Sequence, residues 1–311
     1  MVNMLKLLRN FLIVIAFLAL FAFFTNSAEL LLKANRLFLL SAIISYLISI
    51  IIWIFAWGIL IRKEKKINFG RLFKIGFASI VGSFTPIQLG VEALRILHLK
   101  KLGIGIKNAV GASMLVKGAK FAIILLLAII FSQPLLNSPY FVWIVNGLVV
   151  IFMATLLFLL PLVPDLGYLL AGIIGILSNI KYLNFLKKLQ EYFLFYIDYL
   201  KGSKKSITVA IFFLAAFSWA FEVISLACSF LSVNLILDIS TIIYTSALIS
   251  ILERIPFLPR GVGLLELICF YFLGAMQLNV SQIGAALIIF AFARLIFPVL
   301  LAIAFSFLYS E

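Results

Sequence analysis

Apolar residues dominate the chain in long runs that are broken at a small number of polar positions. Several runs approach 20 residues, the length that a helix needs to cross a hydrocarbon core of about 30 Å. We predict full membrane spans at residues 11–25, 37–61, 108–131, 140–161, 207–232 and 282–308. Composition agrees, because 65% of the residues are hydrophobic and only 12% are charged, about half the usual charged fraction. The pattern predicts an all-α polytopic integral membrane protein, with a single membrane domain over residues 1–311.

Two shorter apolar stretches allow more than one interpretation. The N-terminus has the basic start and short apolar run of a signal peptide, with a cleavage point after Ala28. We favour an uncleaved first span, and either interpretation leaves residue 30 on the outer side of the membrane. Residues 166–180 are apolar but short, so we predict an interfacial or core segment there rather than a crossing.

Two further apolar regions are interrupted midway by proline and glycine. Residues 70–100 contain the stretch TPIQLG, and residues 238–278 contain IPFLPRGVG. Proline lacks the backbone N–H that a continuous helix needs, and the arms 72–84 and 239–255 measure only about 20 and 25 Å as helices. We therefore predict two re-entrant helical hairpins in addition to about six full spans. A pair of proline-kinked full spans is the alternative.

Charge is distributed unevenly along the chain. Lys and Arg total 25 against 11 Asp and Glu, a formal net charge of +14. With the N-terminus inside, the inside segments carry 18 Lys and Arg and the outside segments carry 2, as the positive-inside rule requires. The segments 62–74 and 181–205 hold most of these cations. We predict a cell-membrane protein with both termini cytoplasmic, whose basic loops face anionic headgroups rather than nucleic acid.

The two interrupted regions resemble each other in sequence. The matched pairs are Pro86 with Pro259, Gly90 with Gly263, Glu92 with Glu266, and Lys120 with Arg294. We therefore predict two repeats at residues 37–131 and 207–308, joined by a connecting span and a basic interfacial helix at 140–205. Because the two hairpins open from opposite sides in the predicted topology, the repeat is inverted. Such repeats build alternating-access sites near the bilayer midplane.

These motifs carry a resemblance to a known family. The stretches TPIQLGVEALRILHLKKLG and PFLPRGVGLLELICFYFLGAMQL, the second followed by AALIIFAFARLI, resemble the flippase-like membrane domain of lysylphosphatidylglycerol synthetases and their stand-alone relatives. The resemblance covers roughly residues 5–308 and implies movement of an aminoacylated or otherwise polar-headed lipid between leaflets. The sequence has no segment for the cytoplasmic synthetase domain, so aminoacyl transfer is not implied. The first half carries Lys117 and Lys120 where relatives often have an acid and arginine cluster, which leaves the headgroup preference open.

Charged side chains inside the predicted membrane region form the candidate site. Each of them needs a partner, a wet cavity or an anionic ligand. The cations are Arg95, Lys117, Lys120, Arg254, Arg260 and Arg294, and the anions are Glu92, Glu222, Glu253 and Glu266. Their positive surplus fits a phosphate-bearing headgroup, while internal ion pairing without a ligand is the alternative. We predict lipid binding by Pro86, Gly90, Glu92, Arg95, Lys117, Lys120, Glu222, Arg260, Gly261, Gly263, Glu266 and Arg294.

Two backbone and geometric expectations accompany this set. Pro298 cannot donate to the carbonyl of Arg294, which predicts a polar acceptor beside the guanidinium in the middle of a span. The inverted repeat predicts that Lys120 and Arg294 face one central cavity, with Glu92 and Glu266 beside it near the hairpin tips.

Signals for catalysis are poor. His98 is the only histidine, and the chain contains no HExxH, Gly-x-Ser-x-Gly or Walker motif. Cys228 and Cys269 lack CxxC spacing, so we expect no metal and no cofactor.

Three functions remain in competition on the sequence. A translocase for an anionic or phosphate-bearing membrane lipid is the leading interpretation. An intramembrane enzyme acting on a lipid-linked phosphate or sugar, with Glu92 or Glu266 as general base, is the first alternative. A non-transporting membrane partner of a separate lipid-modifying enzyme, such as a synthetase or glycosyltransferase, is the second. A homodimer is left open.

Overall fold

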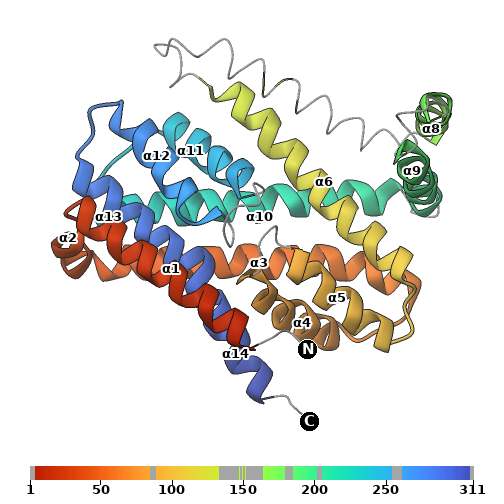
Figure 1. Cartoon of the computed structure of the whole chain (residues 1–311), viewed down its shortest axis with the longest axis horizontal. Coiled ribbons are helices and arrows are strands. Elements are labelled where there is room, and N and C mark those ends of the chain that lie inside the picture. The colour runs from red at the N-terminus through yellow and green to blue at the C-terminus, as the bar shows by residue number, and fades with distance from the viewer. Residues whose placement is uncertain are drawn as a thin grey trace.

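The regular structure of the protein is helical. The computed structural model describes residues 4–84, 89–132, 164–178, 185–201, 205–253 and 261–308, together with residues 147, 149 and 151. Within these ranges there are helices and no strands (Figure 1). The first half contains α1 (Met4–Phe24), α2 (Ala28–Lys33), α3 (Arg36–Glu64), α4 (Phe69–Ser79), the 3₁₀ turn η1 (Ile80–Phe84), α5 (Leu89–Lys101) and α6 (Ile106–Ile130). After them come α8 (Pro164–Leu177), α9 (Phe185–Lys201), α10 (Lys205–Ser232), α11 (Ile239–Leu252), α12 (Leu264–Gly274), α13 (Val280–Ala291), the π-helical turn η6 (Phe292–Ile296) and α14 (Phe297–Leu308).

Among the described residues, four helices are long and apolar enough to cross a membrane. They are α3, α6, α10 and the continuous rod of α13, η6 and α14, and they coincide with four of the six predicted spans. The predicted span at 11–25 lies in α1, whose apolar part, Leu8–Phe24, is shorter than 18 residues. The predicted span at 140–161 lies mostly outside the described residues. The protein is therefore a multi-pass membrane protein, and these two spans stay predictions.

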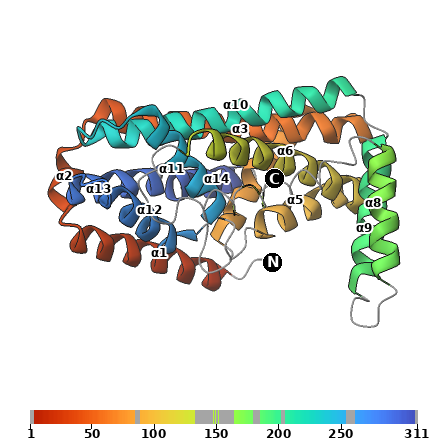
Figure 2. The ribbon, with the colours of Figure 1, turned by 90° about the horizontal axis from the view of Figure 1, so that it is seen from above.

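Helices α3 and α10 form a long antiparallel pair, which crosses the middle of the view in Figure 1 and lies along one side of the molecule in Figure 2. The pair is tied at one end by the Asn35 amide, which donates to the Ser232 carbonyl at 2.7 Å. Along its length the Ser225 hydroxyl donates to the Ala42 carbonyl at 2.7 Å. Small and hydroxylated residues let helix backbones approach closely and bond across the contact, which lipid cannot replace.

The two interrupted regions each fold as a pair of short helices in contact. Helix α4 with η1 packs against α5, and α11 packs against α12. Each first arm begins at a polar cap: Asn68 accepts from the Gly70 amide, and Asp238 accepts from the Thr241 amide. The 11 residues of α4 and the 14 of α11 extend about 17 and 21 Å. Neither helix is long enough to cross a bilayer alone.

A glycine allows the arms of the first pair to touch. A Cβ atom on Gly82 would lie 2.3 Å from the carbonyl carbon of Gly90 and 2.5 Å from the amide nitrogen of Val91. The atoms that a Cβ would meet belong to the backbone of α5, which cannot rotate away as a side chain can. Gly82 therefore fixes the distance between η1 and α5.

The last helix of each half packs across onto the other half. Helix α6 contacts α10 and α11, while α14 contacts α4 and η1, and η6 contacts α3. Helix α6 and the α13–α14 rod begin at opposite ends of the molecule (Figure 1). The largest apolar core lies where α1, α3, α10 and the α13–α14 rod meet.

Helices α8 and α9 form a separate pair at one end, lying across the long axis of the molecule (Figure 2). Helix α9 buries Phe193, Tyr196 and Ile197, whereas Lys187 and Lys201 are exposed. This agrees with the amphipathic basic helix predicted within 181–205. Residues 166–180, predicted as an interfacial or core segment, contribute most of α8, which packs on α9 through Ala171.

Candidate functional site

A polar cavity lies between the two halves. It has a volume of about 100 Å³ and is lined by parts of α3, η1, α5, α6, α10 and α11. Its charged and hydroxyl groups include Ser49, Glu92, Lys117, Lys120, Glu222 and Glu253. Because these residues come from the middle of α3 and α6 as well as from the short arms, the cavity lies midway along the long helices. A volume of this size holds a few water molecules or a small polar group.

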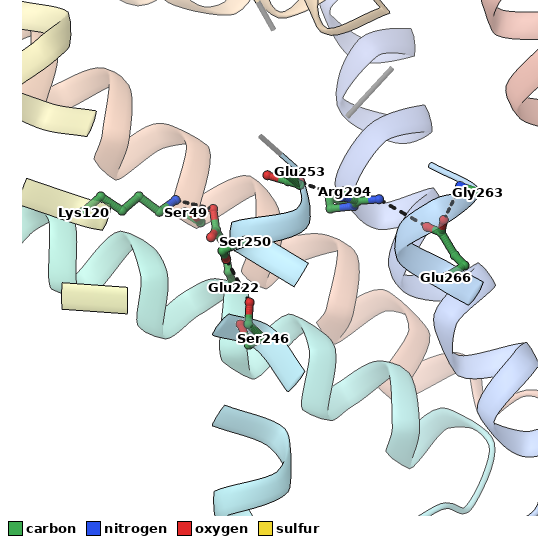
Figure 3. A network of polar contacts seen from close by, with 9 residues as sticks. All are labelled: Ser49, Lys120, Glu222, Ser246, Ser250, Glu253, Gly263, Glu266 and Arg294. Atoms are coloured by element: carbon green, nitrogen blue, oxygen red, sulfur yellow. Dashed lines mark hydrogen bonds and ion pairs between the residues drawn. The ribbon is translucent and has the colours of Figure 1, made fainter. Parts of the chain in front are cut away.

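Lys120 on α6 binds a carboxylate from the other half. Its Nζ atom lies 2.6 Å from Oε1 of Glu222 on α10, and the Ser49 hydroxyl donates to the same oxygen at 3.0 Å (Figure 3). The Lys120 and Glu222 side chains are 16% and 14% exposed. The pair is therefore held by α3, α6 and α10 together, with access to the cavity. Such charge-assisted bonds are the strong ones in a poorly hydrated site.

Glu92 on α5 lies between two cations. Its Oε1 atom is 2.9 Å from Nζ of Lys117 and 3.8 Å from Nη1 of Arg95. The exposed fraction of the side chain is 34% for Lys117 and only 1% for Arg95. The cavity wall therefore presents Lys117, and Arg95 lies behind it. The guanidinium carbon of Arg95 is 3.6 Å from the ring centroid of Trp53, which also lines the cavity.

Arg294 is bound between two carboxylates in the second half (Figure 3). Its Nη1 donates to Glu253 at 2.6 Å and its Nη2 donates to Glu266 at 3.2 Å. The side chains of Arg294 and Glu266 are each 1% exposed. Glu266 also accepts from the Gly263 amide at 2.6 Å at the start of α12, as the third residue of a capping box does. The carboxylate thus joins the helix start to the guanidinium.

The π-helical turn η6 places Arg294 in this position. The Phe297 amide donates to the Phe292 carbonyl, five residues back. Pro298 follows directly and has no amide to continue the α-helical pattern toward Arg294. The proline signal in the sequence was therefore informative, although the extra residue in the turn was not predicted. Single π turns inside helices are frequent at functional sites.

The chain is similar to a known membrane family over nearly its whole length. A family model described as the lysylphosphatidylglycerol synthase TM region matches residues 9–302. The chain belongs to that family. The match confirms the resemblance carried by the two Pro/Gly motifs, and it associates the protein with a lipid-related function in a membrane. A search of curated proteins and a search of solved structures each found no match.

The buried charges of this family member balance within the described residues. The cations Arg95, Lys117, Lys120 and Arg294 are paired with the anions Glu92, Glu222, Glu253 and Glu266. The positive surplus inferred from the sequence rests on Arg254 and Arg260, which lie outside the described residues. Internal pairing, the alternative left open by the sequence, is therefore present. An anionic ligand would have to compete with these glutamates.

One geometric prediction from the repeat was wrong. Arg294 is not among the residues that line the cavity, whereas Lys120 is. Glu253 separates them, because it lines the cavity and binds Arg294. The reason is that the repeat-related glutamates differ in partner: Glu266 binds Arg294, but Glu92 binds Lys117 rather than Lys120.

The described glycines of the predicted site lie either at a close backbone contact or at a positive φ angle. Gly90 contacts Gly82 between η1 and α5. Gly261 and Gly263 have positive φ values of 69° and 100°, a conformation that glycine adopts without strain. Pro86 and Arg260 lie outside the described residues. Cys228 and Cys269 are free, and the described residues contain no cluster of three or more potential metal ligands.

Sequence reasoning left three contributors out of the site. Glu253 was predicted as a buried charge but not as a site residue. Its position directly after an apolar helix of 14 residues could have indicated a role in the site. Trp53, with Trp57 four residues later, forms an aromatic face beside Arg95, and this spacing was visible. Ser49 gave no signal, because serine is common in membrane helices.

Proposed function

We propose that the protein moves an anionic, phosphate-bearing lipid between leaflets, with the headgroup passing through the cavity between the halves. The observation that carries the proposal is the placement of Lys117 and Lys120 on one helix, both lining the cavity and both partly exposed to it. Ammonium groups in a poorly hydrated cavity are suited to a phosphate. Their neighbours Glu92 and Glu222 offset the charge of the two lysines when no ligand is bound, which lowers the cost of burying that charge.

The helix arrangement supports passage rather than surface binding. The cavity lies midway along α3 and α6 and is closed at its sides by η1, α5 and α11, which belong to the short interrupted pairs. We propose that these pairs are re-entrant hairpins and that residues 37–131 and 207–308 are inverted repeats. The correspondence of α3, α4–α5 and α6 with α10, α11–α12 and α13–α14 supports this view, because short discontinuous helices at repeat interfaces form the central sites of many transporters.

The distribution of charge supports an orientation. The basic ends of α3 and α5, the start of α4 and the α8–α9 pair lie toward one end of the molecule. Helix α2 with its flanking residues and the loop at 233–238 lie at the other end (Figure 1). We propose that the basic end is cytoplasmic. A headgroup would then approach Lys117 and Lys120 from the leaflet richest in anionic lipid.

Leaflet exchange in reconstituted vesicles tests the proposal. Fluorescent phosphatidylglycerol and phosphatidylcholine are compared by quenching from outside, with the wild-type protein and the double variant Lys117→Gln/Lys120→Gln. Loss of two bonds to a phosphate, each worth about 1.5–3 kcal/mol, predicts at least a tenfold slower exchange of phosphatidylglycerol. The control Lys187→Gln/Lys201→Gln makes the same charge change on exposed positions of α9 and is expected to exchange at the wild-type rate.

The outcomes separate the competing functions. Wild-type exchange by the α6 double variant, or equal rates for both lipids in the wild-type protein, would contradict the proposal. Chemical conversion of the labelled lipid, followed by mass spectrometry of the extracted vesicles, would favour the enzyme. Neither exchange nor conversion would favour a partner of a separate lipid-modifying enzyme.

A further inference from the structure

Arg95 is a buried cation whose outer nitrogens make no hydrogen bond to the residues that the structure describes. The side chain is 1% exposed, and its Nε donates to the Ser79 hydroxyl at 3.0 Å. The guanidinium carbon lies 3.6 Å from the Trp53 ring and 5.0 Å from the Trp57 ring. Within the described part of the chain, neither Nη1 nor Nη2 has a hydrogen-bond partner. The group is thus fixed in place with donors unused, which is costly in a dry interior.

Glu92 is the anion nearest to those donors. Its Oε1 atom lies 3.8 Å from Nη1 of Arg95, beyond hydrogen-bond length, and 2.9 Å from Nζ of Lys117. All three residues lie on α5 and α6, so no helix has to move for the carboxylate to change partner. A shift of about 1 Å would bring Glu92 within bonding distance of Arg95.

Glu222, the carboxylate that binds the second cavity lysine, has no such alternative among the described residues. Glu222 binds Lys120 at 2.6 Å and accepts from Ser49, and Arg294 is already engaged by Glu253 and Glu266. If Glu222 moved away from Lys120, the Ser49 hydroxyl would be its one remaining partner among the described residues. Of the two lysines that line the cavity, Lys117 can therefore be released by its carboxylate at the lower cost.

We infer that Glu92 is a movable counter-ion that leaves Lys117 for Arg95 when a phosphate group enters the cavity. Lys117 then contacts the phosphate, and Arg95 acts as a positioning residue that receives the carboxylate without touching the lipid. This inference rests on the proposed function and deepens it, because a counter-ion that moves in this way would select ligands that carry an anionic group. A ligand without one leaves the Glu92–Lys117 pair closed.

A thermodynamic cycle of ligand binding tests the exchange. The affinity of dihexanoyl phosphatidylglycerol is measured in detergent for the wild type, Arg95→Gln, Glu92→Gln and the double variant. We expect Arg95→Gln to weaken binding about tenfold in the wild-type background, a coupling of about 1.4 kcal/mol. In the Glu92→Gln background, where no carboxylate has to move, we expect the same change to alter affinity less than about twofold. Glu92→Gln alone should bind at least as tightly as the wild type.

Ser79→Ala is the matched control for packing. It removes the Nε bond of Arg95 and leaves both Nη groups in place, so we expect wild-type affinity. Equal losses from Arg95→Gln in both backgrounds would mean that Arg95 is only structural, and no loss in either would mean that Glu92 does not move. Both results overturn the inference.

A second measurement covers the case in which Arg95→Gln does not fold. A structure of the wild-type protein in nanodiscs of phosphatidylglycerol should show Glu92 within hydrogen-bond distance of Arg95 and separated from Lys117. An unchanged Glu92–Lys117 contact beside a bound phosphate overturns the inference. Because these experiments measure binding and not exchange, a protein that shifts Glu92 but moves no lipid would contradict the proposed function alone.

Discussion

The two halves of the protein use similar sequence elements to build different charge centres. In the first half, Lys117 and Lys120 line the cavity with exposed fractions of 34% and 16%. In the second half, Arg294 and Glu266 are each 1% exposed and lie outside the cavity lining. Positions that match in sequence between the two halves therefore face different surroundings. We interpret the first centre as the ligand-handling one and the second as a fixed support for α11, α12 and the α13–α14 rod.

The difference follows from how many contacts hold each cation. Arg294 binds carboxylates on two other segments, and one of these also caps α12. Lys120 binds a single carboxylate. A guanidinium presents several donors in a fixed plane, while an ammonium is a compact charge on a flexible stem. Arginine thus suits the support, and lysine suits a group that must change partner.

The largest expected effect comes from Arg294→Gln. The change leaves Glu253 and Glu266 close together without their cation, and breaking a buried ion pair costs about 3–5 kcal/mol. Thermal unfolding in detergent should show a large drop in the transition temperature. The control is Lys120→Gln, at the position that matches Arg294 in sequence. Because the Lys120–Glu222 pair faces the cavity and is partly exposed, we expect this variant to lower the free energy of unfolding by about 1 kcal/mol. Equal losses for the two variants would remove the distinction between the halves.

The next effect concerns the close approach in the first hairpin. In Gly82→Ala the new methyl group would meet the Gly90 backbone at 2.3 Å, so η1 and α5 must separate, at a cost of about 1–3 kcal/mol. The unfolding temperature and the lipid exchange rate should both fall. Gly70→Ala is the control on α4, since its nearest neighbouring atom would be 3.6 Å away and alanine favours a helix. A neutral Gly82→Ala would show that the arms need not touch.

Much of the fold could be predicted from the sequence, because the lengths of apolar runs are set by the membrane. The four long helices, the short arms of α4 and α11, and the basic amphipathic α9 all follow from run length, proline, glycine and charge.

The pairing of charges could not be predicted in the same way. Lys117 and Lys120 lie three residues apart on one helical face, and a small rotation of α6 decides which of them meets Glu92. Glu222 reaches Lys120 across 102 residues of sequence, so only tertiary packing brings them together. The π turn at Arg294 likewise depends on how Pro298 is accommodated.

The smallest expected effect compares the caps of the two first arms. Hydrogen bonds from the Thr241 side chain and amide hold the pKa of the Asp238 carboxyl below its ordinary value of 3.8. A lowered folded-state pKa gives stability that is present above the ordinary value and is lost as the pH falls through the folded value. Asn68, the corresponding cap of α4, does not titrate. Because Asp238 is exposed, we expect its charged cap to contribute at most about 0.5–1 kcal/mol to the free energy of unfolding.

Unfolding of the wild type and Asp238→Asn between pH 5 and pH 3 measures this contribution. This range extends about one unit to either side of the ordinary carboxyl pKa. We expect the wild type to lose stability relative to Asp238→Asn as the pH falls. Parallel pH profiles for the two proteins would show that the cap contributes nothing through its charge.

Photo-crosslinking of a phosphatidylglycerol that carries a diazirine beside its phosphate tests the central claim most directly. In vesicles, we predict adducts on the cavity-lining parts of α3 and α6, between Ser49 and Trp53 and between Lys117 and Ile124. The double variant Lys117→Gln/Lys120→Gln should lose these adducts while it keeps those on exposed outer residues such as Leu12 and Leu20. Adducts confined to the outer residues of the wild-type protein, or cavity adducts that persist unchanged in the double variant, would contradict the account.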